Sequence, residues 1–310
     1  GGNRWARGAE QSRDLRVTTR LPGPELRYPV ALRGEDPVKL AMGLLGAFLA
    51  FLVVVQLLAQ AVLGVGWLFR GQPNFEDYRS RALAYELPDG ILASHLGIAG
   101  LLLCVLLIQR YWHGRKGGWV MSVQPGGRWR YLLICLVLAA VLLNIVMWLM
   151  RGGNMAWQAA QPDWMIYLVL ILITSPLQAA AEEFFFRGYL QQAIGSLAGR
   201  AWVGILCSAL VFAFFHGHQN IALFAHRLGF GLIAGILVWA TGGLEAAIAV
   251  HAANNVFAFG YALFTGGVAA LKATSEISWE AACSDLAGFA VFGVAAWWIG
   301  RRMHVATLTP

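Results

Sequence analysis

Long apolar runs separated by short polar segments dominate this chain of 310 residues. Eight runs stand out, and the first lies within Leu40–Trp67, which contains no charged residue. An apolar run of about 17–25 residues is long enough to cross a bilayer as a helix. The pattern therefore predicts an all-α fold, a polytopic transmembrane helical bundle of about eight spans, at residues 40–66, 91–110, 131–150, 165–186, 201–216, 228–241, 244–264 and 283–300.

The basic residues between the runs indicate the orientation of the bundle. If the N-terminus lies inside and the chain crosses eight times, the inner segments carry 17 Lys and Arg residues and the outer segments carry 6. Cytoplasmic loops of membrane proteins show such an excess of Lys and Arg. We therefore expect an N-in/C-in, multi-pass integral membrane protein, which in a bacterium lies in the inner (plasma) membrane.

Composition agrees with a membrane protein and argues against a nucleic-acid partner. Hydrophobic residues make up 58% of the chain and charged residues 13%, whereas a soluble domain has about a quarter charged residues. The net charge of +7 resides mainly in the segments between the runs, where basic side chains face lipid headgroups. We expect the lipid bilayer, and no nucleic acid, as a partner.

Ionisable side chains within the apolar runs cluster in the second half of the chain. Each costs about 2.5–3.5 kcal/mol to place in the middle of a span, so such groups mark functional sites by default. The first three runs offer only Asn144 and a few similar polar residues. The cluster comes from the fourth, fifth and seventh runs and consists of Glu182, Glu183, Arg187, His216, His251 and Asn255.

Helical spacing gives the two adjacent glutamates different surroundings. Glu183 and Arg187 are four residues apart, so they share a helix face and can form an ion pair. Glu182 points roughly 140° away from Arg187, which leaves it available for acid–base chemistry. His251 and Asn255 are also four residues apart and share a face.

These residue types supply what peptide-bond hydrolysis requires, namely a water, a base and donors for the oxyanion. Glu182 can take a proton from a water that His216 holds or shares. His251 and Asn255 can donate hydrogen bonds to the tetrahedral oxyanion. The set needs no serine or cysteine nucleophile.

Three motifs in this part of the chain resemble those of the CPBP family, which comprises CAAX prenyl endopeptidases and bacteriocin-processing or Abi-type membrane proteins. They are Glu-Glu-x-x-x-Arg at 182–187, Phe-x-x-x-His at 212–216 and His-x-x-x-Asn at 251–255, in the family's order. The resemblance implies an eight-helix intramembrane glutamic endopeptidase that cleaves a membrane-associated peptide or protein substrate.

The resemblance also implies a role for each motif residue. Glu182 would be the base and His216 its water-holding partner, and His251 with Asn255 would form the oxyanion site. The supporting residues would be Glu183 and Arg187.

The expected organisation follows from the position of these motifs. We expect a polar cytoplasmic tail at 1–39, N-terminal transmembrane helices at 40–160, a catalytic transmembrane core at 161–300 and a short cytoplasmic tail at 301–310. Three prolines argue against a long helix in the first tail, which we expect to be mostly flexible. The segment 69–90 is the longest outer loop and has room for a short interfacial helix.

Three alternatives stay open at this point. Glu182, His216 and His251 offer N and O ligands to a divalent metal such as zinc, although no His-x-x-x-His pair favours a metal and the sequence favours no cofactor. A non-enzymatic membrane protein of the same fold, such as an immunity factor or a chaperone for a membrane complex, would tolerate their loss. A transporter would use the two glutamates as a proton relay and would need a continuous polar path.

The side from which a substrate enters is also open. The motifs lie at the inner ends of the fourth and seventh runs but near the outer end of the fifth. Prenylated peptides, leader peptides and membrane-anchored regulators all fit a site of this kind.

Overall fold

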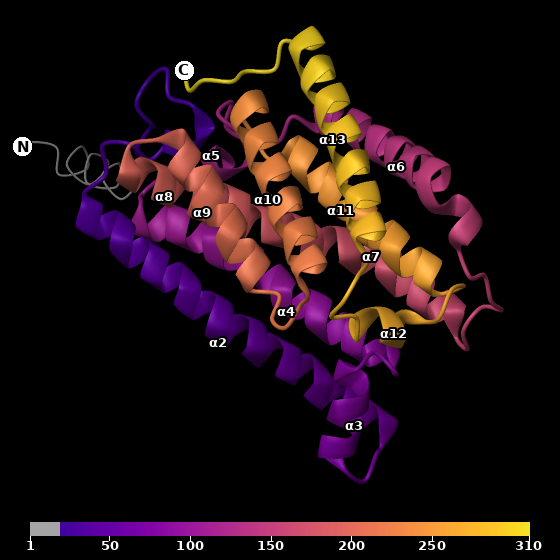
Figure 1. The fold of residues 1–310 in the computed structure, drawn as a ribbon. Coiled ribbons are helices and arrows are strands. Elements are labelled where there is room, and N and C mark those ends of the chain that lie inside the picture. The colour runs from indigo at the N-terminus through magenta and orange to yellow at the C-terminus, as the bar shows by residue number, and fades with distance from the viewer. Residues whose placement is uncertain (1–18) are drawn as a thin grey trace, which may run out of the picture.

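The computed structural model describes residues 19–310, which form a bundle of helices joined by short loops (Figure 1). No β-strand forms within this range, where the pairs Arg27–Leu308 and Ser122–Gly243 make isolated bridges. Eight helices form the bundle: α2 (Pro37–Arg70), α4 (Pro88–Leu107), α6 (Trp129–Arg151), α7 (Trp164–Glu183), α9 (Ala201–Phe214), α10 (Ile221–Thr241), α11 (Glu245–Ala262) and α13 (Trp279–Arg302).

Shorter elements complete the chain between these eight helices. They are the single turns η1 (Tyr28–Val30) and η3 (Gly152–Asn154), the π-helical segments η2 (Ile108–Trp112) and η4 (Phe184–Leu190), and the short helices α3 (Phe75–Leu83), α5 (Gly118–Met121), α8 (Gln191–Ala198) and α12 (Val268–Lys272). The predicted short helix in the outer loop 69–90 is therefore confirmed as α3.

All eight predicted spans coincide with helices, which confirms a polytopic helical bundle in a multi-pass integral membrane protein. Within the described range, six helical stretches are long and apolar enough to cross a membrane. The two remaining helices are α9, with 14 residues, and α11, which is buried along its first nine residues. These two therefore face protein more than lipid, as their shorter or more polar runs predicted.

Local sequence signals set the ends of these helices. The Asp36 side chain accepts hydrogen bonds from the first backbone amides of α2, and Pro37 occupies the first helical position. Asn220 and Ser278 cap α10 and α13 in the same way. Gly242 ends α10 in the left-handed conformation at a φ of 72°, which a residue without a Cβ adopts at low cost.

The helices pack as a closed ring in which each contacts the next. Along the ring α2 contacts α4, α4 contacts α7, α7 contacts α11, α11 contacts α6, α6 contacts α13, α13 contacts α10, and α10 contacts α9. The short α8 joins α9 and α2 and closes the ring. Helices α7 and α11 lie side by side within it (Figure 1), and these two helices carry most of the predicted site.

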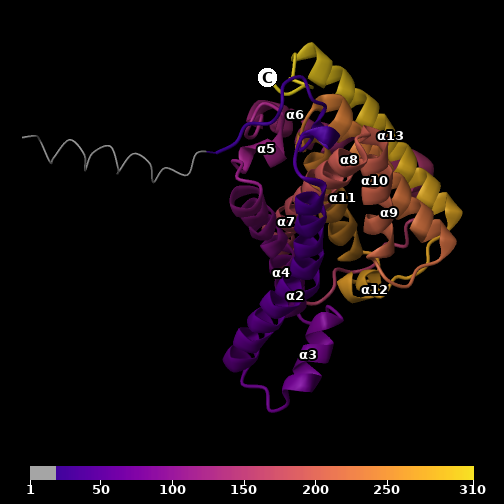
Figure 2. The ribbon, with the colours of Figure 1, turned by 90° about the vertical axis from the view of Figure 1, so that its left-hand side faces the viewer.

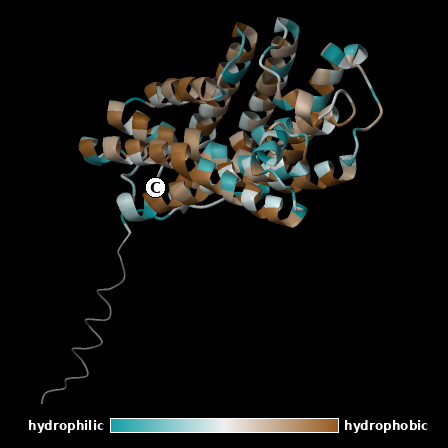
Figure 3. Ribbon diagram, turned by 90° about the horizontal axis from the view of Figure 1, so that it is seen from below, coloured by the Kyte–Doolittle hydropathy of each residue, from teal (hydrophilic) through white to brown (hydrophobic). Residues whose placement is uncertain are grey.

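The outer surface suits a lipid environment. Large exposed hydrophobic side chains occur along most of the long helices, for example Leu57 in α2, Leu133 in α6 and Ile173 in α7. Hydrophobic residues cover much of the helices in Figure 3, and hydrophilic ones gather at their ends and in the loops. Helix α2 is 34 residues long, and with α3 it extends beyond the rest of the bundle (Figure 2).

Residues 19–36 are not the flexible tail that the sequence predicts. Tyr28 and Leu32 are fully buried, and the Tyr28 hydroxyl donates to the Val120 carbonyl. The Arg115 guanidinium donates to the Ala31 carbonyl at 2.7 Å. The prediction was wrong here because apolar residues between the charged ones fill the end of the bundle. The first part of the predicted tail, residues 1–18, lies outside the described residues.

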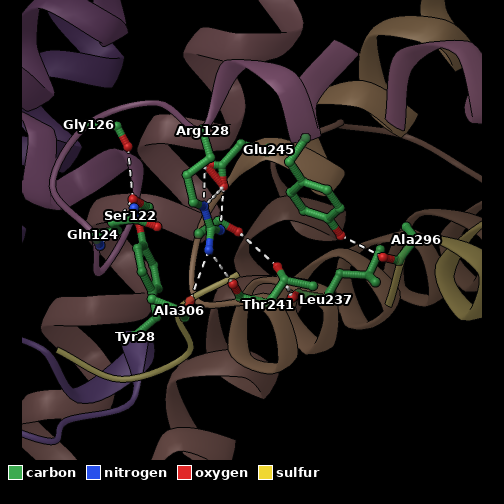
Figure 4. Close-up of polar contacts among 12 residues, drawn as sticks. Tyr28, Ser122, Gln124, Gly126, Arg128, Leu237, Thr241, Glu245, Ala296 and Ala306 are labelled. Carbon is green, nitrogen blue, oxygen red and sulfur yellow. Dashed lines mark hydrogen bonds and ion pairs between the residues drawn. The ribbon is translucent and has the colours of Figure 1, made fainter. Parts of the chain in front are cut away.

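A buried ion pair fixes the start of α11 at the same end of the bundle. Figure 4 shows Arg128 reaching between Glu245 and the end of α10. Its Nε lies 3.0 Å from Glu245 Oε1, and its Nη1 donates to the carbonyls of Thr241 and Ala306 at 2.8 and 2.9 Å. Arg128 thereby holds α10, α11 and the C-terminal segment in one arrangement.

Candidate active site

Four predicted site residues line a single large cavity inside the bundle. The cavity has a volume of about 1060 Å³, and its wall includes Glu182, His216, His251 and Asn255. They come from α7, from the loop after α9, and from α11. The structure thus places all four residues in the wall of one cavity, and their individual roles stay predictions.

The two glutamates point to different places, as their spacing predicts. Glu182 lies at the cavity wall and is 7% exposed, whereas Glu183 is fully buried. Arg187 Nη1 lies 3.4 Å from Glu183 Oε1. The helix becomes π-helical directly after Glu183, and such widened turns are frequent at functional sites.

His251 lies between the two glutamates. Its Nδ1 is 2.6 Å from Glu183 Oε1, and its Nε2 is 3.8 Å from Glu182 Oε2. A carboxylate accepts hydrogen bonds, so Nδ1 carries the proton that binds Glu183. The longer separation to Glu182 exceeds a direct hydrogen bond but fits a shared water.

A residue outside the motifs, Gln178, connects Glu182 with Asn255. Gln178 lies one turn before Glu182 in α7, and its side-chain amide donates to Glu182 Oε1. The Gln178 carbonyl oxygen accepts from Asn255 Nδ2 at 3.0 Å. Asn254 Nδ2 in turn lies 3.5 Å from Asn255 Oδ1. One N–H of the Asn255 amide therefore remains available for a further acceptor.

His216 faces the cavity from the end of α9 and is exposed there. Its Nδ1 donates to the Phe212 carbonyl at 2.6 Å, so in the neutral ring Nε2 carries the free lone pair. The Phe212 ring lies edge-on to both imidazoles, with centroid distances of 4.5 Å to His216 and 6.1 Å to His251. The Phe212 ring therefore contacts both imidazoles at the cavity wall.

Aromatic rings pack around the Arg187 guanidinium next to the cavity wall. Arg187 is fully buried, and its Cζ lies 4.1 Å from the Phe212 ring centroid and 5.2 Å from that of Phe230. Cation–π attraction offsets part of the cost of burying this charge. The carboxylate of Glu183, 3.4 Å from Arg187 Nη1, offsets a further part, and Glu183 also binds His251.

The sequence reasoning missed several polar residues of the cavity wall, including Gln178 and His95. Gln178 could have been found from its position four residues before Glu182, which places both side chains on one helix face. His95 of α4 is buried and places its Nδ1 2.8 Å from Thr174 Oγ1. The expectation that the first three runs offer little beyond Asn144 was wrong, because a histidine within an apolar run is itself a signal.

The tautomers of the two histidines limit the donors that a metal could use. Among residues 19–310, no group of three or more His, Cys, Asp or Glu side chains is arranged to hold an ion. The His251 Nδ1 and His216 Nδ1 atoms are both engaged by protein oxygens. Glu182 and the two Nε2 atoms are the remaining donors, and chelation provides the test of whether they bind a metal.

Comparison with known proteins shows a similarity over the part of the chain that contains the site. Residues 163–257 match the family model described as type II CAAX prenyl endopeptidase, Rce1-like. The chain is also 28% identical over 281 residues to the uncharacterized protein YyaK of Bacillus subtilis (strain 168), in an alignment that covers 81% of this chain and 91% of that protein. No solved structure matches the chain.

The matched range contains all six residues that the motifs singled out, from Glu182 to Asn255. The family resemblance predicted from the three motifs is therefore confirmed. The candidate site of this multi-pass membrane protein thus lies in a region, residues 163–257, that is similar to the Rce1-like type II CAAX prenyl endopeptidases.

Proposed function

We propose that the protein is an intramembrane endopeptidase that hydrolyses a membrane-associated peptide or protein with a water activated by Glu182. The family match supports an endopeptidase. The observation that carries the finer proposal is the 3.8 Å separation between Glu182 Oε2 and His251 Nε2 at the wall of the cavity. A water in this gap would contact both groups.

In the proposed reaction the Glu182 carboxylate takes a proton from this water, and the water oxygen bonds to the carbonyl carbon of the scissile peptide. The carbonyl electron pair moves to oxygen and forms the oxyanion. When the tetrahedral intermediate collapses, the C–N bond breaks and Glu182 returns the proton to the leaving amine. His216 supports the water through its free Nε2.

The oxyanion would receive hydrogen bonds from the free N–H of Asn255 and from His251 Nε2–H. A protonated His251 can make both this bond and the bond to Glu183. In that form the two carboxylates, Glu182 and Glu183, balance the two cations, Arg187 and His251. Charge balance of this kind lowers the cost of keeping the cluster in the bundle.

The alternatives differ from this proposal in testable ways. A proton-relaying transporter needs a polar path through the bundle, whereas the rings of Phe186 and Phe230 belong to the cavity wall and pack against the fully buried Arg187. A non-enzymatic protein of the same fold would retain its activity in cells when Glu182 is replaced.

The deciding experiment compares purified wild type with Glu182→Gln in detergent. Cleavage of membrane-tethered peptides is followed by mass spectrometry, with and without a metal chelator. Glu276→Gln, an exposed residue near the cavity mouth, is the matched control for loss of a carboxylate. We expect cleavage by wild type and Glu276→Gln, none by Glu182→Gln, and no effect of the chelator.

Other outcomes reject parts of the proposal. Loss of cleavage on chelation would assign the reaction to a metal-dependent version of the peptidase. Equal cleavage by wild type and Glu182→Gln would remove Glu182 from the mechanism. If neither protein cleaves any peptide while Glu182→Gln still functions in cells, the protein is not an endopeptidase.

A further inference from the structure

The cavity extends from the site toward one end of the bundle only. Its wall includes loop residues at the α12 end, among them His218, Met155, Gly267 and Thr274. In contrast, none of its lining residues, all of which belong to the described chain, comes from the loops 113–128, 199–200, 242–244 or 303–310 at the opposite end. The site is thus reached from the end that carries α12 (Figure 1).

The opposite end is closed by packed side chains. At Gly188, next to Arg187, an added Cβ would lie 2.9 Å from the Val120 side chain and 3.5 Å from the Leu244 side chain. The segments that carry Val120 and Leu244 therefore pack closely against Gly188. Residues 19–36 and the C-terminal segment cover this end further, since Leu26 N donates to Thr309 Oγ1 at 2.8 Å. Substrate can therefore not reach Glu182 from the side on which the C-terminus lies without disrupting this packing.

The two ends also differ in charge. Within residues 19–310, the closed end carries twelve Lys and Arg residues, namely Arg20, Arg27, Arg33, Lys39, Arg110, Arg115, Lys116, Arg128, Arg130, Arg200, Arg301 and Arg302. The cavity end carries six, namely Arg70, Arg79, Arg81, Arg151, Arg227 and Lys272. Four of these six are ion-paired with acids of the same end.

An excess of Lys and Arg marks the cytoplasmic side of a membrane protein. We infer that the closed end is cytoplasmic and that the cavity opens to the extracytoplasmic side. The substrate class is then a peptide segment presented outside the cytoplasm, either an exported peptide at the membrane surface or the outer part of a membrane-anchored protein. A protein whose lipidated end stays in the cytoplasm meets the closed end of the bundle.

The direction of the cavity is independent of the chemistry, whereas cleavage of an extracytoplasmic peptide rests on the proposed function. The direction is tested by labelling intact bacterial cells with a membrane-impermeant maleimide, in a background whose four cysteines are replaced. Thr274→Cys reports the cavity mouth, Glu76→Cys reports α3, and Lys116→Cys reports the closed end. All three positions are exposed, and each label is normalised to the label obtained after permeabilisation.

We expect Thr274→Cys and Glu76→Cys to react fully in intact cells and Lys116→Cys to react only after permeabilisation. The reverse pattern overturns the inference, and so does labelling of all three or of none in intact cells. If Thr274→Cys is unreactive even after permeabilisation, the labelling of Glu76→Cys, at the same end of the bundle, decides which side of the membrane that end faces.

A second measurement separates the direction of the cavity from the chemistry. A membrane-impermeant peptide that solubilised wild type cleaves is added to intact spheroplasts that contain either wild type or Glu182→Gln. Cleavage from outside by wild type alone supports the inference. Cleavage that requires permeabilisation overturns it and leaves the proposed endopeptidase intact. If solubilised wild type cleaves nothing, the proposed function fails, while the labelling still decides the direction.

Discussion

His251 Nδ1 lies 2.6 Å from Oε1 of Glu183, the same carboxylate that forms the ion pair with Arg187. The sequence motifs alone leave Glu183 as a partner of Arg187. The structure adds that Glu183 fixes the orientation and the tautomer of the imidazole that faces Glu182. The supporting pair and the proposed chemistry are therefore linked through one side chain.

The first prediction concerns the charge of Glu183. Glu183→Gln leaves the buried Arg187 without its counter-charge, which typically costs about 3–5 kcal/mol of unfolding free energy. The new amide can also present its NH₂ to His251 Nδ1 and reverse the tautomer, a change that costs up to about 10⁴ in rate in another hydrolase. Unfolding in mixed detergent micelles and peptide cleavage measure the two effects.

The matched control is the double variant Glu183→Gln/Arg187→Met. It removes both charges, so we expect it to be more stable than Glu183→Gln alone. If the double variant loses as much free energy as the two single variants together, the pair is not coupled and the ion pair described above is irrelevant to stability.

The second prediction concerns Gln178, which orients both Glu182 and Asn255. Gln178→Leu removes a hydrogen bond to a carboxylate, an interaction worth about 1.5–3 kcal/mol, and we expect kcat to fall about 10–100-fold. KM should change little, because Gln178 acts through its neighbours. The control is Gln192→Leu, a buried glutamine in α8 that bonds the Trp119 carbonyl away from the cavity. An equal loss in both variants would contradict a positioning role.

The third prediction tests the ion pair between Arg128 and Glu245. The Glu245 side chain is fully buried, and Arg128 also bonds two carbonyls. Arg128→Met leaves that carboxylate unpaired, and we expect a loss of about 3–5 kcal/mol in unfolding free energy. Arg128→Met/Glu245→Met should recover part of this loss. Unchanged stability of Arg128→Met would show that the pair does not hold α11.

The fourth prediction concerns pH and uses His113, just beyond the end of the second span. Burial lowers the pKa of His113 to about 4, because desolvation outweighs the attraction of Glu35 and because Lys39 and Arg115 also disfavour its charge. Its Nε2 lies 2.8 Å from the Tyr189 hydroxyl. The folded protein therefore holds His113 neutral over a pH range in which the unfolded chain protonates it.

The sign of the pH effect follows from that difference in proton binding. Above the ordinary histidine pKa of about 6.5 neither state binds the proton, and stability does not depend on this group. As the pH falls from there toward 4, only the unfolded state binds it, so unfolding free energy falls by on the order of 3 kcal/mol. His113→Gln should lack this part of the pH dependence, and an unchanged slope in the variant would refute the assignment.

The sequence predicted the parts of the molecule that depend on local pattern. Apolar runs located the eight helices, because a helix in lipid must be apolar over a fixed length. The i, i+4 spacing predicted the contact between Glu183 and Arg187, which survives the π-helical turn that follows. The convergence of residues 182, 216 and 251 followed from the motifs rather than from any spacing along the chain.

The remaining features depend on packing between distant segments. Residues 28–32 look like part of a charged tail, yet Tyr28 and Leu32 are buried because the bundle has an apolar end to cover. The contacts of Gln178 with Asn255 and of His95 with Thr174 depend on packing as well, since each joins residues of two different helices. The end at which the cavity opens could not be read from motifs that lie at different ends of three spans.

The bridge between Arg27 and Leu308 joins residues that are 281 positions apart in the chain. A ribosome makes Leu308 only after every helix of the bundle has been made, so this contact forms later than those of Tyr28 and Ala31 with earlier segments. The cover over the closed end is therefore assembled in two stages, separated by the synthesis of the whole bundle. A chain that lacks residues 303–310 would keep all its helices and lose only the second stage, which leaves the segment around Arg27 and Leu26 without its partner.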